Sequence, residues 1–234
     1  MRKSLLLIAT AVLAMTACTQ DVPEQEGGAP AINGEINVSA TIDENTRTSM
    51  TVDGDNLSVS WVAGDGIGMF ATDGSGSIGD NVKYTAASNE PTSKFTKVTE
   101  AIKWGEGTHN FYAYYPYATA TDVTAVPISV PAVQEQSEAG NLDHLQPYAF
   151  LYAGKTGVSA SSSVVLNFKN ALSVLEVNLC TARGTINCEG IIFRAEDNAE
   201  VVSTEGATID ITNGTIVNKA GYFFVTNGYN DNLH

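Results

Sequence analysis

Short runs in which apolar and polar residues alternate recur along most of this chain. In the stretch EINVSATID the apolar positions are Ile36, Val38, Ala40 and Ile42. This period of two places every second side chain on the same face of a strand. Further runs of strand type lie at 57–62, 66–71, 82–85, 93–98, 109–115, 126–130, 148–153, 163–168, 172–180, 186–193, 207–211 and 221–226. Because turn sequences such as AGDG at 63–66 separate the runs, the pattern predicts an all-β protein built from antiparallel sheets, as in a sandwich or a barrel.

Composition agrees with a folded protein and excludes one class of partner. Apolar residues make up 43% of the chain and charged residues 16%, which is ordinary for a globular protein. The formal net charge is −14, and no run of basic residues is longer than two. Since nucleic-acid binding needs a basic surface, we expect neither DNA nor RNA as a partner.

The first residues have the order of a bacterial export signal. Arg2 and Lys3 precede an apolar stretch at 5–15 that is too short to span a bilayer comfortably, and small residues lead from it to Cys18. The order LAMTAC is similar to the lipobox of bacterial lipoproteins, in which the cysteine is acylated, with palmitate among the acyl chains, and becomes the first mature residue. Simple secretion is the alternative. We expect residues 1–17 to be a signal peptide and the lipid on Cys18 to hold the protein on the outer membrane, at the cell surface.

Shifts in composition divide the mature chain into three parts. Residues 18–34 are rich in proline, glycine and acidic residues, which predicts a disordered, solvated tether. A small polar stretch around 156–162 predicts a boundary between an N-terminal β-sandwich domain, 35–158, and a C-terminal β-sandwich domain, 159–234. The second part is short for a sandwich and ends without a closing strand, so we expect it to be truncated.

Two cysteines remain beyond the signal, Cys180 and Cys188. They flank a turn-like ARGT at 182–185, and in a hairpin centred there they would face each other across the strands. An exported protein lies where such a pair can oxidise, so a disulfide and two free thiols are both open. Zinc would need two further ligands that the neighbouring sequence does not supply, and we expect no metal site.

The most aromatic segment is HNFYAYYPYATA at 109–120. In a strand, Phe111 and Tyr115 point to one face and Tyr112 and Tyr114 to the other. A strand with rings on both faces is typical of an interior position between two layers. We therefore expect a core strand here rather than an exposed platform on which a sugar stacks.

Known catalytic patterns are absent from the sequence. His109, His144 and His234 lie far apart, and there is no H-E-x-x-H, G-x-S-x-G or C-x-x-C motif. The stretch GSGSIG at 74–79 fits G-x-G-x-x-G, but strand-like residues follow it where a dinucleotide site needs a helix. We interpret it as a glycine-rich loop and expect no cofactor and no enzymatic activity.

Several blocks, taken in order, resemble the fimbrillin-like lipoproteins of Bacteroidota, which include subunits of the type V pilus. The blocks are SVSWVAGDGIGMF at 58–70, FYAYYPY at 111–117, ISVPAVQEQ at 128–136, FLYAG at 150–154 and VVLNFKNALSVLEVNL at 164–179. Asn170 departs from the pattern, because many relatives have histidine at that place. The resemblance implies two transthyretin-like antiparallel β-sandwich domains, the second of them incomplete here.

The resemblance also implies a mechanism of assembly. In this family a protease cuts the lipoprotein precursor after an arginine beyond the first strand, and a strand of the next subunit fills the groove that the removed strand leaves. Arg47 stands at the corresponding place, so the new N-terminus would be Thr48, and the displaced strand would carry Ile36, Val38, Ala40 and Ile42. Such an exchange is physically sound, because removing a strand exposes unpaired backbone and apolar pockets to which another strand can add.

The function that the resemblance implies is that of a fimbrial or pilus-type structural subunit, a surface lipoprotein that assembles by strand exchange and mediates adhesion. Its partners would be other fimbrillin-type subunits, outer-membrane lipid and host or bacterial surface receptors, and it would lie in the fimbrium once processed. In the family the strand donor lies in a C-terminal segment beyond the length of this chain, so we expect this chain to accept a strand rather than to donate one. The alternative is a non-polymerising surface lipoprotein that binds glycans or host ligands.

Overall fold

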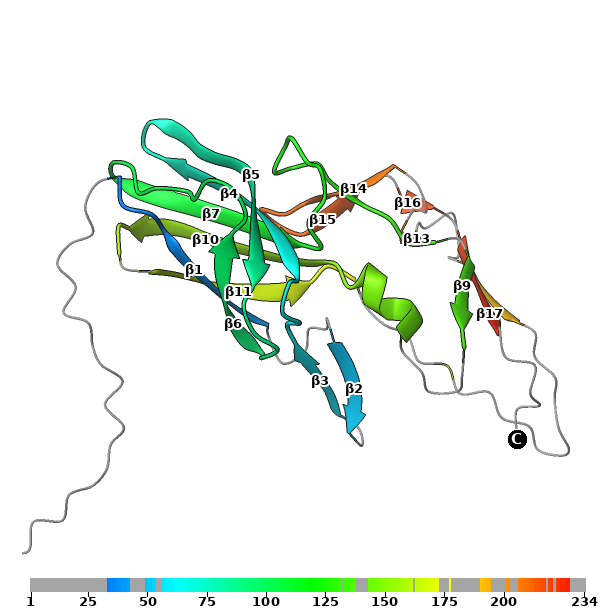
Figure 1. Ribbon diagram of the computed structural model, residues 1–234. Helices are drawn as coiled ribbons and strands as arrows, with labels where there is room; N and C mark the ends of the chain where they lie inside the picture. Colours follow the sequence, from blue (N-terminus) through cyan, green and yellow to red (C-terminus); the bar gives the residue numbers. More distant parts are fainter. Residues whose placement is uncertain are drawn as a thin grey trace, which may run out of the picture.

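Almost all of the secondary structure in the computed structural model is β (Figure 1). The structure describes residues 33–42, 49–53, 56–131, 133–137, 143–161, 163–172, 177, 190–194, 201–202, 206–217, 219–220 and 222–227. Within these stretches the helical element is a short 3-10 helix, η1 (Asp143–Tyr148). The prediction of an all-β fold is confirmed.

The largest sheet closes on itself into a seven-stranded barrel. In spatial order its strands are β1 (Asn37–Ile42), β11 (Ser163–Asn170), β10 (Leu151–Ser159), β7 (Thr108–Tyr115), β4 (Gly66–Asp73), β5 (Gly76–Ala86) and β6 (Thr92–Lys97). Neighbouring strands run antiparallel, with the exception of β1 and β11, which run parallel. Closure removes the free edges that an open sheet would present.

The remaining strands form smaller sheets. One contains β15 (Thr215–Val217), β14 (Ala207–Asp210) and β8 (Val126–Ile128), and another contains β12 (Gly190–Arg194), β17 (Tyr222–Asn227) and β9 (Val133–Gln136). Two pairs complete the set: β13 (Val201–Val202) with β16 (Lys219–Ala220), and the hairpin of β2 (Ser49–Asp53) with β3 (Asn56–Ser60).

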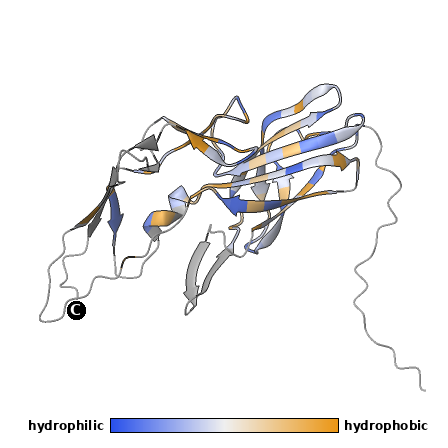
Figure 2. Ribbon diagram, turned by 180° about the vertical axis from the view of Figure 1, so that it is seen from behind, coloured by the Kyte–Doolittle hydropathy of each residue, from blue (hydrophilic) through white to orange (hydrophobic). Residues whose placement is uncertain are grey.

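One apolar cluster fills the interior of the barrel. The period of two is clearest on β11, where Val164, Leu166 and Phe168 are fully buried while Val165 between them is 40% exposed. Figure 2 shows the same alternation as hydrophobic and hydrophilic bands along the strands of the barrel. The alternating sequence thus forms strands because each strand buries one face and exposes the other.

The aromatic strand β7 buries both of its faces, as its sequence predicts. Phe111 and Ala113 belong to the interior cluster of the barrel, whereas Tyr114 points outward into a second apolar cluster. That second cluster lies between the barrel and the β8–β14–β15 sheet, because it also contains Val126 of β8 and Ile209 of β14. The run is therefore a core strand between two layers.

Residues 74–75 of the glycine-rich stretch form the turn of the β4–β5 hairpin, and residues 76–79 are the start of β5. Asp73 holds the turn, since its Oδ1 accepts hydrogen bonds from the backbone N–H groups of Ser75 (2.7 Å) and Gly76 (3.1 Å). Gly76 has a φ of +135°, a backbone conformation that residues other than glycine rarely adopt. The interpretation of 74–79 as a loop is therefore right for residues 74–75 and wrong for 76–79, because β5 begins at Gly76, earlier than the pattern predicts.

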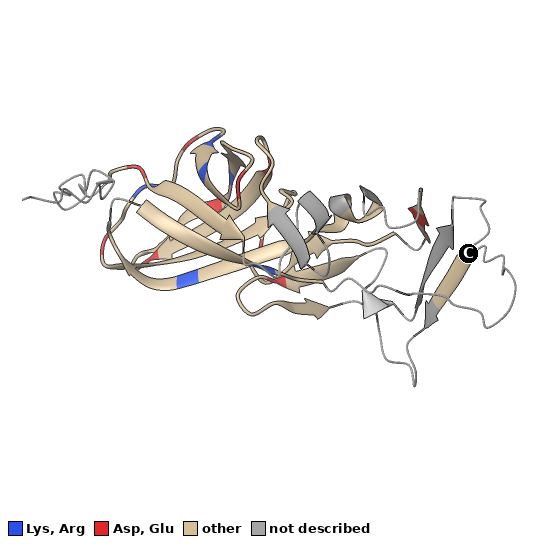
Figure 3. Ribbon diagram, turned by 90° about the horizontal axis from the view of Figure 1, so that it is seen from below, with Lys and Arg blue, Asp and Glu red and all other residues tan. Residues whose placement is uncertain are grey.

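Charged residues are scattered over the strands and loops of the barrel in the view of Figure 3. Lys97 on β6 forms an ion pair with Glu35, which lies two residues before β1 and pairs with Lys103 as an isolated β-bridge. Both side chains of the ion pair are exposed, and exposed pairs contribute little to stability.

The closed sheet does not by itself reproduce the implied pair of transthyretin-like sandwiches. Both that arrangement and the boundary between 35–158 and 159–234 stay predictions. β11 follows this boundary in the sequence, and in the barrel it pairs with β1 on one side and β10 on the other.

Candidate strand-exchange site

The candidate site is the position that β1 occupies between β11 and β6. On one side β1 pairs in parallel with β11, from Asn37 with Ser163 to Ile42 with Phe168. On its other side it pairs antiparallel with β6, through Val38 with Phe95 and Ala40 with Ser93 among others. β1 is thus the strand that joins β6 to β11 and closes the barrel (Figure 1). Without β1, both β6 and β11 would become edge strands.

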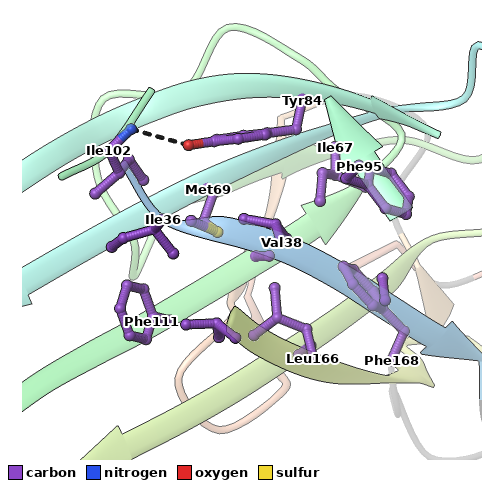
Figure 4. Close-up of a cluster of buried hydrophobic side chains, with 14 of the residues drawn as sticks. Ile36, Val38, Ile67, Met69, Tyr84, Phe95, Ile102, Phe111, Leu166 and Phe168 are labelled. Atoms are coloured by element: carbon purple, nitrogen blue, oxygen red, sulfur yellow. Dashed lines mark hydrogen bonds between the residues drawn. The ribbon is translucent and has the colours of Figure 1, made fainter. Parts of the chain in front are cut away.

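The sequence-predicted residues of this strand point together into the core. Ile36, Val38, Ala40 and Ile42 are at most 4% exposed. Figure 4 shows Ile36, the residue before β1, and Val38 of β1 pointing toward the interior cluster, in which Leu166 and Phe168 extend from the neighbouring strand. Full burial of a valine or isoleucine side chain stabilises a protein by about 1.5–3 kcal/mol. The inward face of β1 therefore contributes several kcal/mol to the barrel.

Both ends of β1 are held by backbone groups outside the barrel strands. The N–H of Ile36 donates to the carbonyl of Ile102 (2.9 Å), and the N–H of Ile42 donates to the carbonyl of Pro91 (3.0 Å). Tyr84 in turn fixes Ile102, because its hydroxyl oxygen accepts the Ile102 N–H at 2.9 Å (Figure 4). These contacts fix the position of both ends of β1.

Trp61 contacts the middle of β1 from inside the barrel. Its Nε1–H donates to the carbonyl of Ala40 at 3.1 Å, and both residues are fully buried. The indole packs edge-on against Phe95 of β6, with ring centroids 5.0 Å apart, and against Phe168 of β11, at 5.1 Å. The ring therefore contacts the occupying strand and both strands that flank it.

A tight turn after Trp61 places Asp65 beside Tyr115. The Val62 N–H donates to Oδ2 of Asp65 (2.8 Å), and the Tyr115 hydroxyl donates to Oδ1 (3.3 Å). Burial raises the pKa of the Asp65 carboxyl, and the two hydrogen bonds oppose that rise. Burial also raises the pKa of the Tyr115 hydroxyl, and the nearby Asp65 carboxylate adds to this rise. Tyr115 packs against Trp61 at 5.7 Å between ring centroids, so the turn supports the indole.

The remaining sequence-predicted site residues lie outside the described part of the chain. These are Cys18, Arg47, Thr48, Cys180 and Cys188. Lipidation, cleavage and disulfide formation at these residues stay predictions.

Sequence reasoning gave no role to Trp61, Asp65 or Tyr84. The signal for the first two was the block SVSWVAGDGIGMF, in which a tryptophan precedes a turn sequence. Within the described stretches no group of His, Cys, Asp and Glu side chains is arranged to hold a metal ion. None of the helical structure in the same stretches has the length and apolar character needed to cross a membrane.

Comparison with known proteins gives a family and several structural likenesses. The model of the fimbrillin-like family matches residues 46–232. The matched range begins four residues after the end of β1 at Ile42. No curated protein matches the sequence. A Bacteroides ovatus crystal structure whose description assigns it to cell adhesion is 21% identical, with a TM-score of 0.48, and the match covers 86% of this chain and 76% of that one.

Two further crystal structures are similar at lower scores. One, from Bacteroides uniformis and also assigned to cell adhesion, is 18% identical with a TM-score of 0.43, and the match covers 86% of this chain and 69% of the other. The second is a fimbrial protein from Bacteroides ovatus, 14% identical with a TM-score of 0.40, and the match covers 84% of this chain and 42% of that one. Because the family model spans most of the sequence, the chain belongs to the fimbrillin-like family of fimbrial-type surface proteins.

Proposed function

We propose that this protein is a fimbrial subunit that assembles by exchange of β1 and mediates adhesion to host or bacterial surfaces. The observation that carries the proposal is the double pairing of β1, which hydrogen-bonds to β11 and to β6 and buries its inward face in the barrel core. Its removal would leave a groove with two unpaired backbone edges and an apolar floor. A strand from another subunit fits such a groove by β-augmentation.

The groove would be unstable when empty, and this favours its refilling. Each buried apolar side chain of β1 that is withdrawn exposes its own surface and the cavity that it occupied. A strand that restores these contacts along with the backbone hydrogen bonds would dissociate slowly, because its release would again expose the apolar surface and leave the cavity empty.

Cleavage after Arg47 would separate β1 from the rest of the chain. Arg47 lies between the end of β1 at Ile42 and the start of β2 at Ser49. β2 pairs with β3 in a two-stranded sheet of their own, so a cut at this place divides two separately paired elements.

The proposal links release from the membrane to activation of the groove. A lipid on Cys18 would lie on the same side of the cut as β1. The uncut protein would therefore be anchored and closed, while the cut subunit would be free of lipid once β1 leaves. One cleavage would thus make a surface lipoprotein competent for assembly.

Cleavage with an arginine-specific protease tests the proposal. The substrate is the purified protein with Cys18→Ser, which prevents acylation. We expect a new N-terminus at Thr48, exchange of the β1 fragment for a labelled peptide of residues 33–47, and filaments in negative-stain micrographs. Exchange without filaments would assign the donor strand to another fimbrillin-type subunit.

The matched controls alter only the cleavage site. Two proteases are compared, the arginine-specific protease and trypsin. Arg47→Ala is expected to stay uncut at position 47 and monomeric with both. Arg47→Lys is expected to resist the arginine-specific protease and to be activated by trypsin. A protein that is cut at Thr48 and yet neither exchanges its fragment nor assembles would overturn the proposal.

A further inference from the structure

The inward-facing side chains of β1 and β6 are smallest at the level of Ala40. Directly paired residues on neighbouring strands share a face, and Ala40 pairs with Ser93 on β6 and with Leu166 on β11. Two small side chains therefore lie next to each other. The adjacent rows are bulkier, because Val38 pairs with Phe95 and Ile42 with Phe168.

The indole of Trp61 lies beside this position, since its Nε1–H donates to the Ala40 carbonyl. Ala40, Ser93 and Trp61 are all at most 1% exposed, and Trp61 packs between Phe95 and Phe168 from the two bulkier rows. The Ser93 hydroxyl is engaged elsewhere, since it accepts N–H bonds from Ala87 and Ser88, each 3.1 Å long. A protein interior at native density has no spare volume, so a longer side chain at the Ala40 position would meet the indole.

Trp61 also hydrogen-bonds to the backbone of the strand that occupies the groove, which in this structure is β1. Its Nε1–H reaches the carbonyl of Ala40 at 3.1 Å, and a strand shifted by one residue would present its other face to the core. The backbone contacts of Ile36 with Ile102 and of Ile42 with Pro91 fix the same register at the two ends.

We infer that Trp61 is the positioning residue that selects the donor strand, and that the groove accepts strands with large apolar, large apolar, small and large apolar side chains at successive inward positions. The inference rests on the proposed strand exchange. It defines the partner by its chemistry: a β-strand with a small residue in third place, whose carbonyl accepts the indole N–H.

Peptide exchange on the cleaved protein tests the inference, because the change is made in the peptide and the protein stays unaltered. The probes are labelled peptides of residues 33–47 with the native sequence, with Ala40→Leu, with Asn37→Leu and with Val38→Asp. Overpacking at Ala40 is expected to weaken binding about 10- to 100-fold. Asn37 is exposed on β1, and leucine there is expected to change binding by less than about threefold.

A Trp61→Phe protein separates positioning from general packing. Phenylalanine is smaller and lacks the N–H donor, so the discrimination between the native and Ala40→Leu peptides is expected to fall below about fivefold even if both bind less tightly. If this variant does not fold, the comparison of peptides on the unaltered protein decides the matter.

The outcomes distinguish the inference from the function on which it rests. Failure of the native peptide to exchange, together with no assembly of the cleaved protein, would overturn the proposed function. Equal binding of the native and Ala40→Leu peptides, together with loss of binding by Val38→Asp, would overturn the inference and leave strand exchange standing.

Discussion

At the scale of single residues, the environment of β1 depends on side chains that are far away in the sequence. Trp61 contacts Ala40, Phe95 and Phe168, and no local pattern brings these residues together. The block SVSWVAGDGIGMF therefore marked the family without revealing the role of its tryptophan. The turn that follows Trp61 was readable as AGDG, but the contact of Asp65 with Tyr115 depends on strand register.

The Asp65 carboxyl should make stability depend on pH in an unusual direction. Burial raises its pKa in the folded state above the ordinary 3.8. Between the pKa of the unfolded state and the higher pKa of the folded state, the folded state holds more protons than the unfolded state, so stability falls as pH rises. Asp65→Asn has no charge to bury. The stability of this variant relative to the parent is therefore expected to increase with pH across this window and then to stay constant, as measured by urea unfolding at a series of pH values.

Asp122 supplies a control of opposite sign. Hydrogen bonds from the Thr124 N–H and hydroxyl, both 2.8 Å long, lower the pKa of its carboxyl. Its contribution to stability is present above the ordinary pKa and is lost as pH falls. Asp122→Asn should thus lose stability relative to the parent as pH rises, and parallel trends for the two variants would contradict the account of Asp65.

At the scale of elements, the period of two predicted β1, β7 and β11 well. Each of these strands buries a set of alternate side chains that the sequence shows directly. The parallel pairing of β1 with β11 was not predictable, because pairing is decided by how the intervening strands fold around a shared core. Position 36–42 could be recognised as a strand, whereas its place as the closing strand of a barrel could not.

The two faces of β1 should respond differently to the same change. Val38→Asp places an unpaired carboxylate among apolar side chains and is expected to lower the free energy of unfolding by about 3–5 kcal/mol. Asn37→Asp introduces the same group at the exposed neighbouring position and should stay within about 0.5 kcal/mol of the parent. Chemical denaturation of the uncut protein measures both, and similar losses would show that β1 has no buried face in solution.

At the scale of the whole molecule, the barrel is covered on one side by the sheet of β8, β14 and β15, whose strands come from the middle and the later part of the chain. The second apolar cluster joins Phe70 and Tyr114 of the barrel to Ile209 of β14. The sequence indicated that both faces of β7 are buried, but it did not indicate which strands cover the outer one. The boundary drawn between 158 and 159 from local composition falls within β10 and ahead of β11, and it stays a prediction.

This shared cluster should make the barrel and its cover unfold together. Ile209 is 2% exposed and Val217 of the same hairpin is 46% exposed. Ile209→Ala is expected to cost about 2–5 kcal/mol, and Val217→Ala about 0.5 kcal/mol or less. Thermal unfolding followed by circular dichroism should show one transition, lowered in temperature by Ile209→Ala, whereas a separate early transition would mean that the layers are independent.

The parallel pairing of β1 with β11 also bears on the order in which a newly made chain can fold. β1 is the first barrel strand to emerge during synthesis and β11 the last, so ring closure requires a contact between distant parts of the polypeptide, and contacts of this kind form slowly. Before β11 is in place, the nascent subunit would have an open barrel in which the backbone edge of β1 that pairs with β11 has no hydrogen-bond partner. If subunits assemble by the proposed strand exchange, that stage would be open to premature pairing with other copies, and a covalently attached native strand, already at high local concentration, would protect against it.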